Sequence, residues 1–326
     1  GQLGNGSADP DSAIPVPVHT TGVMTGRTII GLAAGTAHNL AISADGQLFA
    51  WGVNVEGQLG NGTTSQDPSL TPIPVNTSGA IAGKQFVAVA AGYNHSLALA
   101  TDGTIYAWGS DASGQLGNGY GGSSSSPVAV DLSGELAGRR VVAIAAGRLH
   151  SLALDEAGRV YAWGSNNRGQ VGNNSYNDAQ SPVLINLDPV AGRPVTIVAI
   201  AAGDQHSYAL ALDGAVYAWG DNVHHELGDG SYAAFSRVPV AINLANLGED
   251  VPATLATGAL HGLVRTLSGA LYGWGSNTAS QLGGGYSSSV ALPSRIASGV
   301  LASASIVGLP AGGLGEFSTV LVNSGA

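Results

Sequence analysis

Five histidines recur at a nearly constant interval, and a regular set of imidazoles could serve as metal ligands or as general acids and bases. They lie 55–57 residues apart, at His38, His95, His150, His206 and His261. A residue that recurs once in each structural repeat occupies the same place in every repeat and is therefore far from its copies. We expect these histidines to be structural, with each imidazole satisfying backbone groups of the adjoining turn.

The tryptophans follow the same rhythm. Each lies 13 residues after its histidine, at Trp51, Trp108, Trp163, Trp219 and Trp274. A large indole can fill the layer between neighbouring repeats while its N–H finds a hydrogen-bond acceptor. We expect all five to be structural as well.

One stretch departs from this repeat pattern because it carries several residues that could bind a metal. Between Asp221 and Asp229 the chain carries two adjacent histidines and three acids, where other repeats have small polar residues. Imidazole and carboxylate suit a divalent metal, so His224, His225, Glu226 and Asp229 are the candidate metal ligands. The alternative is a polar loop tip that faces solvent.

No other pattern indicates catalysis or a cofactor. Gly117, Gly119 and Gly122 match the spacing of a dinucleotide-binding loop, but they run into a serine-rich segment ending at Pro127. Dinucleotide binding needs a following helix whose N-terminus holds the pyrophosphate. We therefore expect no cofactor and no enzymatic activity, with an enzyme or metal-dependent site at the mouth of the fold as the alternative.

The elements that must position these residues are short strands. In one repeat they are the apolar run 87–91, the alternating run 95–99, a hairpin at Asp102-Gly103 and the segment 106–109. A proline-flanked strand such as 72–75 completes each unit, since proline suits a sheet edge. Four antiparallel strands repeated radially make a β-propeller, so the chain is predicted to be all-β.

The number of blades follows from the markers of the repeat, which has a period of about 56 residues. Gly-Gln-Leu-Gly segments and close variants of them occur six times, around Gln2, Gln58, Gln115, Gln170, Glu226 and Gln281, but only five units carry both histidine and tryptophan. We predict a single domain over 1–326 with six blades, the last one built from both termini. A truncated seven-bladed ring is the alternative.

The unit Ala-Ala-Gly-x-x-His-Ser-Leu-Ala-Leu, followed by Tyr-Ala-Trp-Gly and Gly-Gln-Leu-Gly-Asn-Gly, resembles the repeat of the regulator of chromosome condensation (RCC1-like) family. The resemblance covers essentially the whole chain and implies a propeller that presents loops to another protein. We expect a bacterial member of the family.

The composition limits the classes of partner and the cellular location that we expect for this chain. The net charge is −10 and Lys84 is the single lysine, so nucleic-acid binding through phosphate neutralisation is not expected. No apolar run approaches the length of a membrane-spanning helix. Absent cysteine and abundant Ser, Thr, Asn and Gly predict an exported, extracellular protein, with a cytoplasmic location as the alternative.

Positions that vary inside the fixed frame are the candidate contacts with a partner protein, because recognition is usually built on loops of a rigid scaffold. They are Tyr93, Arg148, Arg168, Tyr120 and Asp204. We expect a non-catalytic interaction module that binds through one propeller face. A structural subunit of an extracellular assembly, which self-associates by strand addition to an open sixth blade, is a further alternative.

Overall fold

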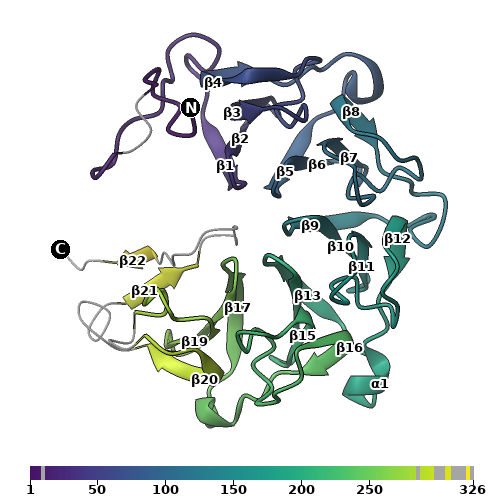
Figure 1. Cartoon of the computed structure of the whole chain (residues 1–326), viewed down its shortest axis with the longest axis vertical. Helices are drawn as coiled ribbons and strands as arrows, with labels where there is room; N and C mark the ends of the chain where they lie inside the picture. The colour runs from purple at the N-terminus through teal and green to yellow at the C-terminus, as the bar shows by residue number, and fades with distance from the viewer. Residues whose placement is uncertain (9–11, 284–286, 297–304, 310–320, 324–326) are drawn as a thin grey trace.

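The computed structural model describes residues 1–8, 12–283, 287–296, 305–309 and 321–323. Within them, five four-stranded antiparallel sheets are arranged around a central axis as the blades of a propeller (Figure 1). In each blade the strands follow one another in chain order. The predicted all-β propeller of four-stranded blades is confirmed.

The strand bounds repeat closely from blade to blade. Blade 1 comprises β1 (Ile29–Ala34), β2 (His38–Ser43), β3 (Leu48–Asn54) and β4 (Ser65–Pro74); blade 2 comprises β5 (Phe86–Ala91), β6 (His95–Ala100), β7 (Ile105–Gly109) and β8 (Ser124–Ala129). Blade 3 comprises β9 (Val141–Ala146), β10 (His150–Asp155), β11 (Val160–Gly164) and β12 (Ala179–Leu184). Blade 4 comprises β13 (Ile197–Ala202), β14 (His206–Ala211), β15 (Val216–Asp221) and β16 (Phe235–Ala241), and blade 5 comprises β17 (Pro252–Thr257), β18 (His261–Thr266), β19 (Leu271–Gly275) and β20 (Val290–Ile296).

A sixth sheet follows blade 5 and contains β21 (Ser305–Gly308) and β22 (Leu321–Asn323). Residues 1–8 contain no strand and contact blade 1, where the Gly6 N–H donates to the Leu70 carbonyl. Parts of the predicted last blade fall in 310–320 and 324–326, outside the described residues. Its construction from both termini stays a prediction.

Short helical turns connect some of the blades: η1 (Gly79–Ile81), α1 (Asp188–Ala191) and η2 (Ala245–Leu247). Among the described residues, no helix combines the length and the apolar content that a bilayer crossing requires.

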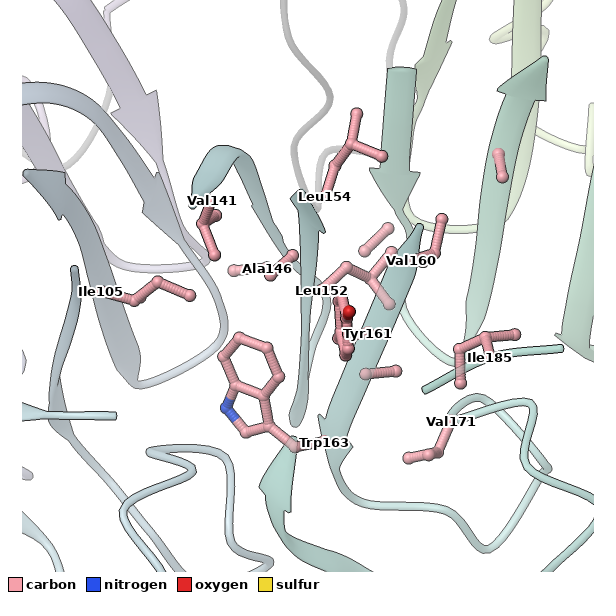
Figure 2. Packing of buried hydrophobic residues seen from close by; sticks show 14 of the residues in the cluster. Ile105, Val141, Ala146, Leu152, Leu154, Val160, Tyr161, Trp163, Val171 and Ile185 are labelled. Carbon is pink, nitrogen blue, oxygen red and sulfur yellow. The ribbon is translucent and has the colours of Figure 1, made fainter. Parts of the chain in front are cut away.

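The first strand of each blade lies nearest the axis, because β1, β5, β9, β13 and β17 contact one another in sequence. The second strand of a blade also contacts the first strand of the next blade, for example β6 with β9. The tryptophans lie in this interface: Figure 2 shows Trp163 beside Ile105, Val141 and Ala146. One buried cluster therefore runs through blades 2, 3 and 4 and makes the ring a rigid support for its loops.

Candidate functional site

The turns that join the first and second strands of blades 1 to 5 follow one another around one mouth of the propeller. Backbone N–H groups link these turns from blade to blade: Tyr93 donates to the Arg148 carbonyl (3.0 Å), Arg148 donates to that of Asp204 (3.1 Å), and Asp204 donates to that of Ala259 (2.8 Å). The two variable residues that precede each repeat histidine are thus linked from blade to blade around the axis of the propeller.

Three of the predicted contact residues come together on this ring. The Arg148 guanidinium lies over the Tyr93 ring, with its central carbon 5.0 Å from the ring centroid. Arg148 Nη1 also donates to Asp204 Oδ2, at 3.4 Å. The Arg148 side chain is 42% exposed and that of Asp204 is 23% exposed. An aromatic ring, a cation and a carboxylate are therefore presented side by side by blades 2, 3 and 4.

Arg168 lies on the loop that follows the tryptophan strand of blade 3. Its Nε lies 3.8 Å from Asp221 Oδ1, an acid of blade 4 that the sequence did not single out as a contact. Burial raises the pKa of both Asp204 and Asp221, while the neighbouring Arg148 and Arg168 respectively oppose that rise. Blades 3 and 4 thus carry two half-exposed arginines, each beside a less exposed carboxyl.

Glu226 replaces the repeat glutamine and keeps one of its bonds. Its Oε2 accepts the His224 N–H (2.8 Å), as Gln170 Oε1 accepts the Arg168 N–H (2.8 Å). The amide of Gln170 also donates to the Ser165 hydroxyl, whereas Glu226 Oε1 is buried without a hydrogen-bond partner. Burial raises the pKa of Glu226 to about 7, and the carboxylates of Asp221 and Asp204 add to the rise.

The other candidate metal ligands point to different partners. The His225 ring packs edge-on against Tyr232, with centroids 5.4 Å apart, and Asp229 Oδ1 accepts the Ser231 N–H (2.9 Å). Within the described part of the chain, no three His, Asp or Glu side chains form a group that could hold a metal ion. The loop forms a turn in which the Glu226 carboxylate caps the His224 N–H. The described residues of the loop bring no three possible metal ligands together, so the metal site stays a prediction.

Tyr120 is placed apart from the other candidates. Its side chain is 78% exposed on the loop before β8, and its backbone N–H donates to Asn118 Oδ1 (3.0 Å). No contact with Tyr93, Arg148 or Asp204 is found for it among the described residues.

Among the described residues, four repeat histidines and four tryptophans lie between neighbouring blades, where one pattern of bonds recurs: His38, His95, His150, His206, Trp108, Trp163, Trp219 and Trp274. The Ser96 hydroxyl and Trp108 Nε1–H both donate to the Gln58 carbonyl, at 2.8 and 2.9 Å. Since the Ser96 proton is used there, His38 Nε2–H is the donor in its 2.9 Å bond to Ser96 Oγ. The next two interfaces repeat this with His95, Ser151, Trp163 and Gln115, and with His150, Ser207, Trp219 and Gln170. Each of these imidazoles binds a hydroxyl of the next blade, not the backbone of its own turn.

The same repeat is what relates the chain to known proteins. The family model described as an RCC1-like domain matches residues 1–325. The chain belongs to this family. The RCC1-like domain is 33% identical to human E3 ubiquitin-protein ligase HERC2 over 270 residues, which cover 82% of this chain and 5% of that protein. It is 32% identical to the Arabidopsis thaliana ultraviolet-B receptor UVR8 over 260 residues, covering 79% of this chain and 56% of the receptor.

The RCC1-like domain thus spans less than two thirds of either relative. Among solved structures, yeast RCC1 (Prp20) bound to Kap60 gives a TM-score of 0.75 at 23% identity, covering 92% of this chain and 68% of that one. At this identity the likeness shows the fold alone.

The RCC1-like domain departs from its own pattern between blades 4 and 5. Gly262 stands where the serine would be, and the Tyr208 hydroxyl donates instead to the Glu226 carbonyl (2.5 Å), which also accepts from Trp274 Nε1–H (2.7 Å). His206 Nε2 forms a hydrogen bond with Thr257 Oγ1 (3.1 Å). Sequence reasoning missed this compensation, although Tyr208, Thr257 and Gly262 all break the repeat.

Proposed function

We propose that this RCC1-like domain is a non-catalytic protein-interaction module whose partner binds the mouth that carries Tyr93, Arg148 and Asp204. The observation that carries the proposal is the contiguous stack of these three side chains on turns of successive blades. Tyr and Arg are enriched among residues that dominate binding energy, and rigid presentation reduces the entropy lost on association. Yeast RCC1 (Prp20), a structural neighbour, is bound to a protein, Kap60.

The nature of the surface favours a protein partner. Arg148 and Arg168 each lie beside a carboxyl, so the mouth presents paired charges of both signs and not a uniform basic or acidic field. Such a surface selects its partner by matching charges in position, and an unmatched partner would bury unpaired charge.

The test is capture of proteins from an extract of the source cell by the immobilised chain, compared with Tyr93→Ala, Arg148→Ala and the matched control Tyr120→Ala. We expect Arg148→Ala and Tyr93→Ala to reduce retention of the partner at least about tenfold, as for hot-spot residues, and Tyr120→Ala to leave it unchanged. Equal retention by the wild type and Arg148→Ala, or loss with Tyr120→Ala alone, would show that the mouth is not the binding face.

A further inference from the structure

A cavity of about 530 Å³ opens at the outer rim between blades 3 and 4. It lies away from the mouth, where the end of β12, the helix α1 and the strand β16 meet (Figure 1). Its apolar wall consists of Leu184, Pro189, Val190, Val238 and Pro239, and its polar wall consists of Gly172, Asn173, Asn174 and Asn186.

In other blades a backbone bond closes the corresponding place. Asn76 N–H donates to the Gly60 carbonyl (2.8 Å), and Asp131 N–H donates to that of Gly117 (2.8 Å). Blade 4 repeats the bond from Asn243 to Gly228 (3.1 Å). In blade 3 the equivalent residues are Asn186 and Gly172, which line the cavity instead. Neither the Asn186 N–H nor the Gly172 carbonyl has a bond to another described residue.

A side-chain bond is lost at the same place. Asn76 Nδ2–H donates to the Ser126 hydroxyl (3.4 Å), and the Ser181 hydroxyl donates to Asp131 Oδ2 (3.2 Å). The serine position becomes Val238 in blade 4, so the side chain of Asn186 has no hydroxyl opposite it. An apolar wall replaces the polar bond.

Two further departures keep the cavity open. Asn174 has φ +62°, where the first two blades have Gly62 and Gly119. A Cβ at Gly62 would lie 3.4 Å from Asn76 Nδ2, so the extra atoms of Asn174 point at the place where the bond would form. The following loop also differs in which residue it buries: it buries Ile81, Leu136 and Leu247 in blades 1, 2 and 4. In blade 3 it buries Leu187 and leaves Val190 half-buried.

We infer that this cavity binds an extended peptide segment of a partner protein by a leucine or isoleucine side chain. The aliphatic group contacts Leu184, Val190 and Val238, which are apolar side chains of the cavity wall. The segment's carbonyl accepts the Asn186 N–H, and its N–H donates to the Gly172 carbonyl. A peptide carries this donor and acceptor together, and so supplies both halves of the missing bond.

The probe is the blocked tripeptide Ac-Gly-Leu-Gly-NH2, titrated into the full chain labelled with ¹⁵N and followed by amide chemical shifts. We expect saturable shifts at Gly172, Asn174, Asn186 and Val238. Ac-Gly-Ala-Gly-NH2 should bind at least about tenfold more weakly, because it buries far less apolar surface. The mouth residues Tyr93 and Arg148 should not shift.

Two variants make the test specific. Val190→Leu fills the cavity and should weaken the leucine peptide at least about tenfold, whereas the matched control Val142→Leu, on the channel strand β9, should not. Val238→Ser offers Asn186 a hydroxyl and should weaken binding of the leucine peptide by a similar factor. This variant keeps the test decisive if Val190→Leu fails to fold. Equal shifts with both peptides, shifts elsewhere, or undiminished binding by both variants would overturn the inference. None of these outcomes bears on binding at the mouth, so the two proposals fail separately.

Discussion

His150 Nε2–H donates to the hydroxyl oxygen of Ser207 across 2.9 Å, although the two residues are 57 positions apart in the chain. The same hydroxyl donates to the Gln170 carbonyl, which also accepts from Trp219. All of these groups are buried, so each interface is joined by a set of bonds that water cannot replace. The stability of the ring therefore depends on contacts between blades as much as on pairing within them.

Removing the central hydroxyl should be costly. Ser207→Ala leaves His150 Nε2–H without an acceptor, and we expect the free energy of unfolding to fall by about 2 kcal/mol. The exposed Ser133→Ala, which breaks only a local turn bond, should cost less than about 0.5 kcal/mol. Urea unfolding measures both, and equal small effects would mean that the bond between blades adds little.

The buried histidines should make the domain sensitive to acid. Burial lowers the pKa of His38 to about 4 and those of His95, His150 and His206 to about 3, below the usual 6.5. Between these values and 6.5 the unfolded chain binds protons that the folded chain excludes. The contribution of these histidines to stability is therefore fully present above pH 6.5 and falls as the pH decreases.

Each such histidine contributes a slope of up to about 1.4 kcal/mol per pH unit. Unfolding measured from pH 7.5 to 4.5 should show a shallower slope for His150→Gln than for the wild type. His19→Gln, which changes an exposed histidine, is the matched control. If His150→Gln left the slope unchanged, the conclusion that burial lowers the pKa of His150 would be contradicted.

Glu226 should act in the opposite direction. Its folded pKa of about 7 exceeds the usual value of 4.5, so the folded chain holds a proton that the unfolded chain releases as the pH rises. Glu226→Gln should therefore stabilise the domain above pH 7 by about 2 kcal/mol, with little gain at pH 4.5. Thermal unfolding at both pH values tests this, with Glu135→Gln on the exposed surface as the control. A gain that is the same at both pH values would show that folding does not raise the pKa of Glu226.

The glycine after Gln-Leu should not tolerate a side chain. Gly117 has φ +65°, and a Cβ there would lie 2.5 Å from Trp163 Nε1. We expect Gly117→Ala to cost more than about 3 kcal/mol, from backbone strain and displacement of the indole. Gly138→Ala has the same kind of backbone, φ +68°, with nothing within 4 Å, and should cost about 1 kcal/mol. If both variants lowered the denaturant midpoint by a similar amount, the close approach of Gly117 to Trp163 would not matter for stability.

Tyr208 and Gly262 should be coupled. A Cβ at Gly262 would lie 2.8 Å from the Tyr208 hydroxyl and closer still to the Trp274 ring, so Gly262→Ser alone should be destabilising. Tyr208→Leu together with Gly262→Ser restores the Leu and Ser of the other interfaces at these two positions, while Thr257 and Glu226 stay as they are. We expect the double variant to be more stable than the sum of the single changes predicts, by at least about 1 kcal/mol. Additive effects in the four-protein comparison would mean that the two substitutions are independent.

The sequence by itself determined the blade. The spacing of His, Trp and Asp-Gly, with short apolar runs between them, predicts four strands and their order, because a strand and its hairpin are specified by neighbouring residues. It also marked Tyr93, Arg148 and Asp204 as variable positions in a fixed frame.

Only the tertiary structure decided which of these residues meet. Tyr93, Arg148 and Asp204 are 55 or 56 residues apart, and their contact depends on how one blade rotates and packs against the next. The same packing separates Tyr120 from them, pairs Arg168 with Asp221, and leaves Asn186 and Gly172 on either side of a cavity. Contacts between blades depend on side-chain volume and register across two sheets, and no local pattern along the chain encodes those quantities.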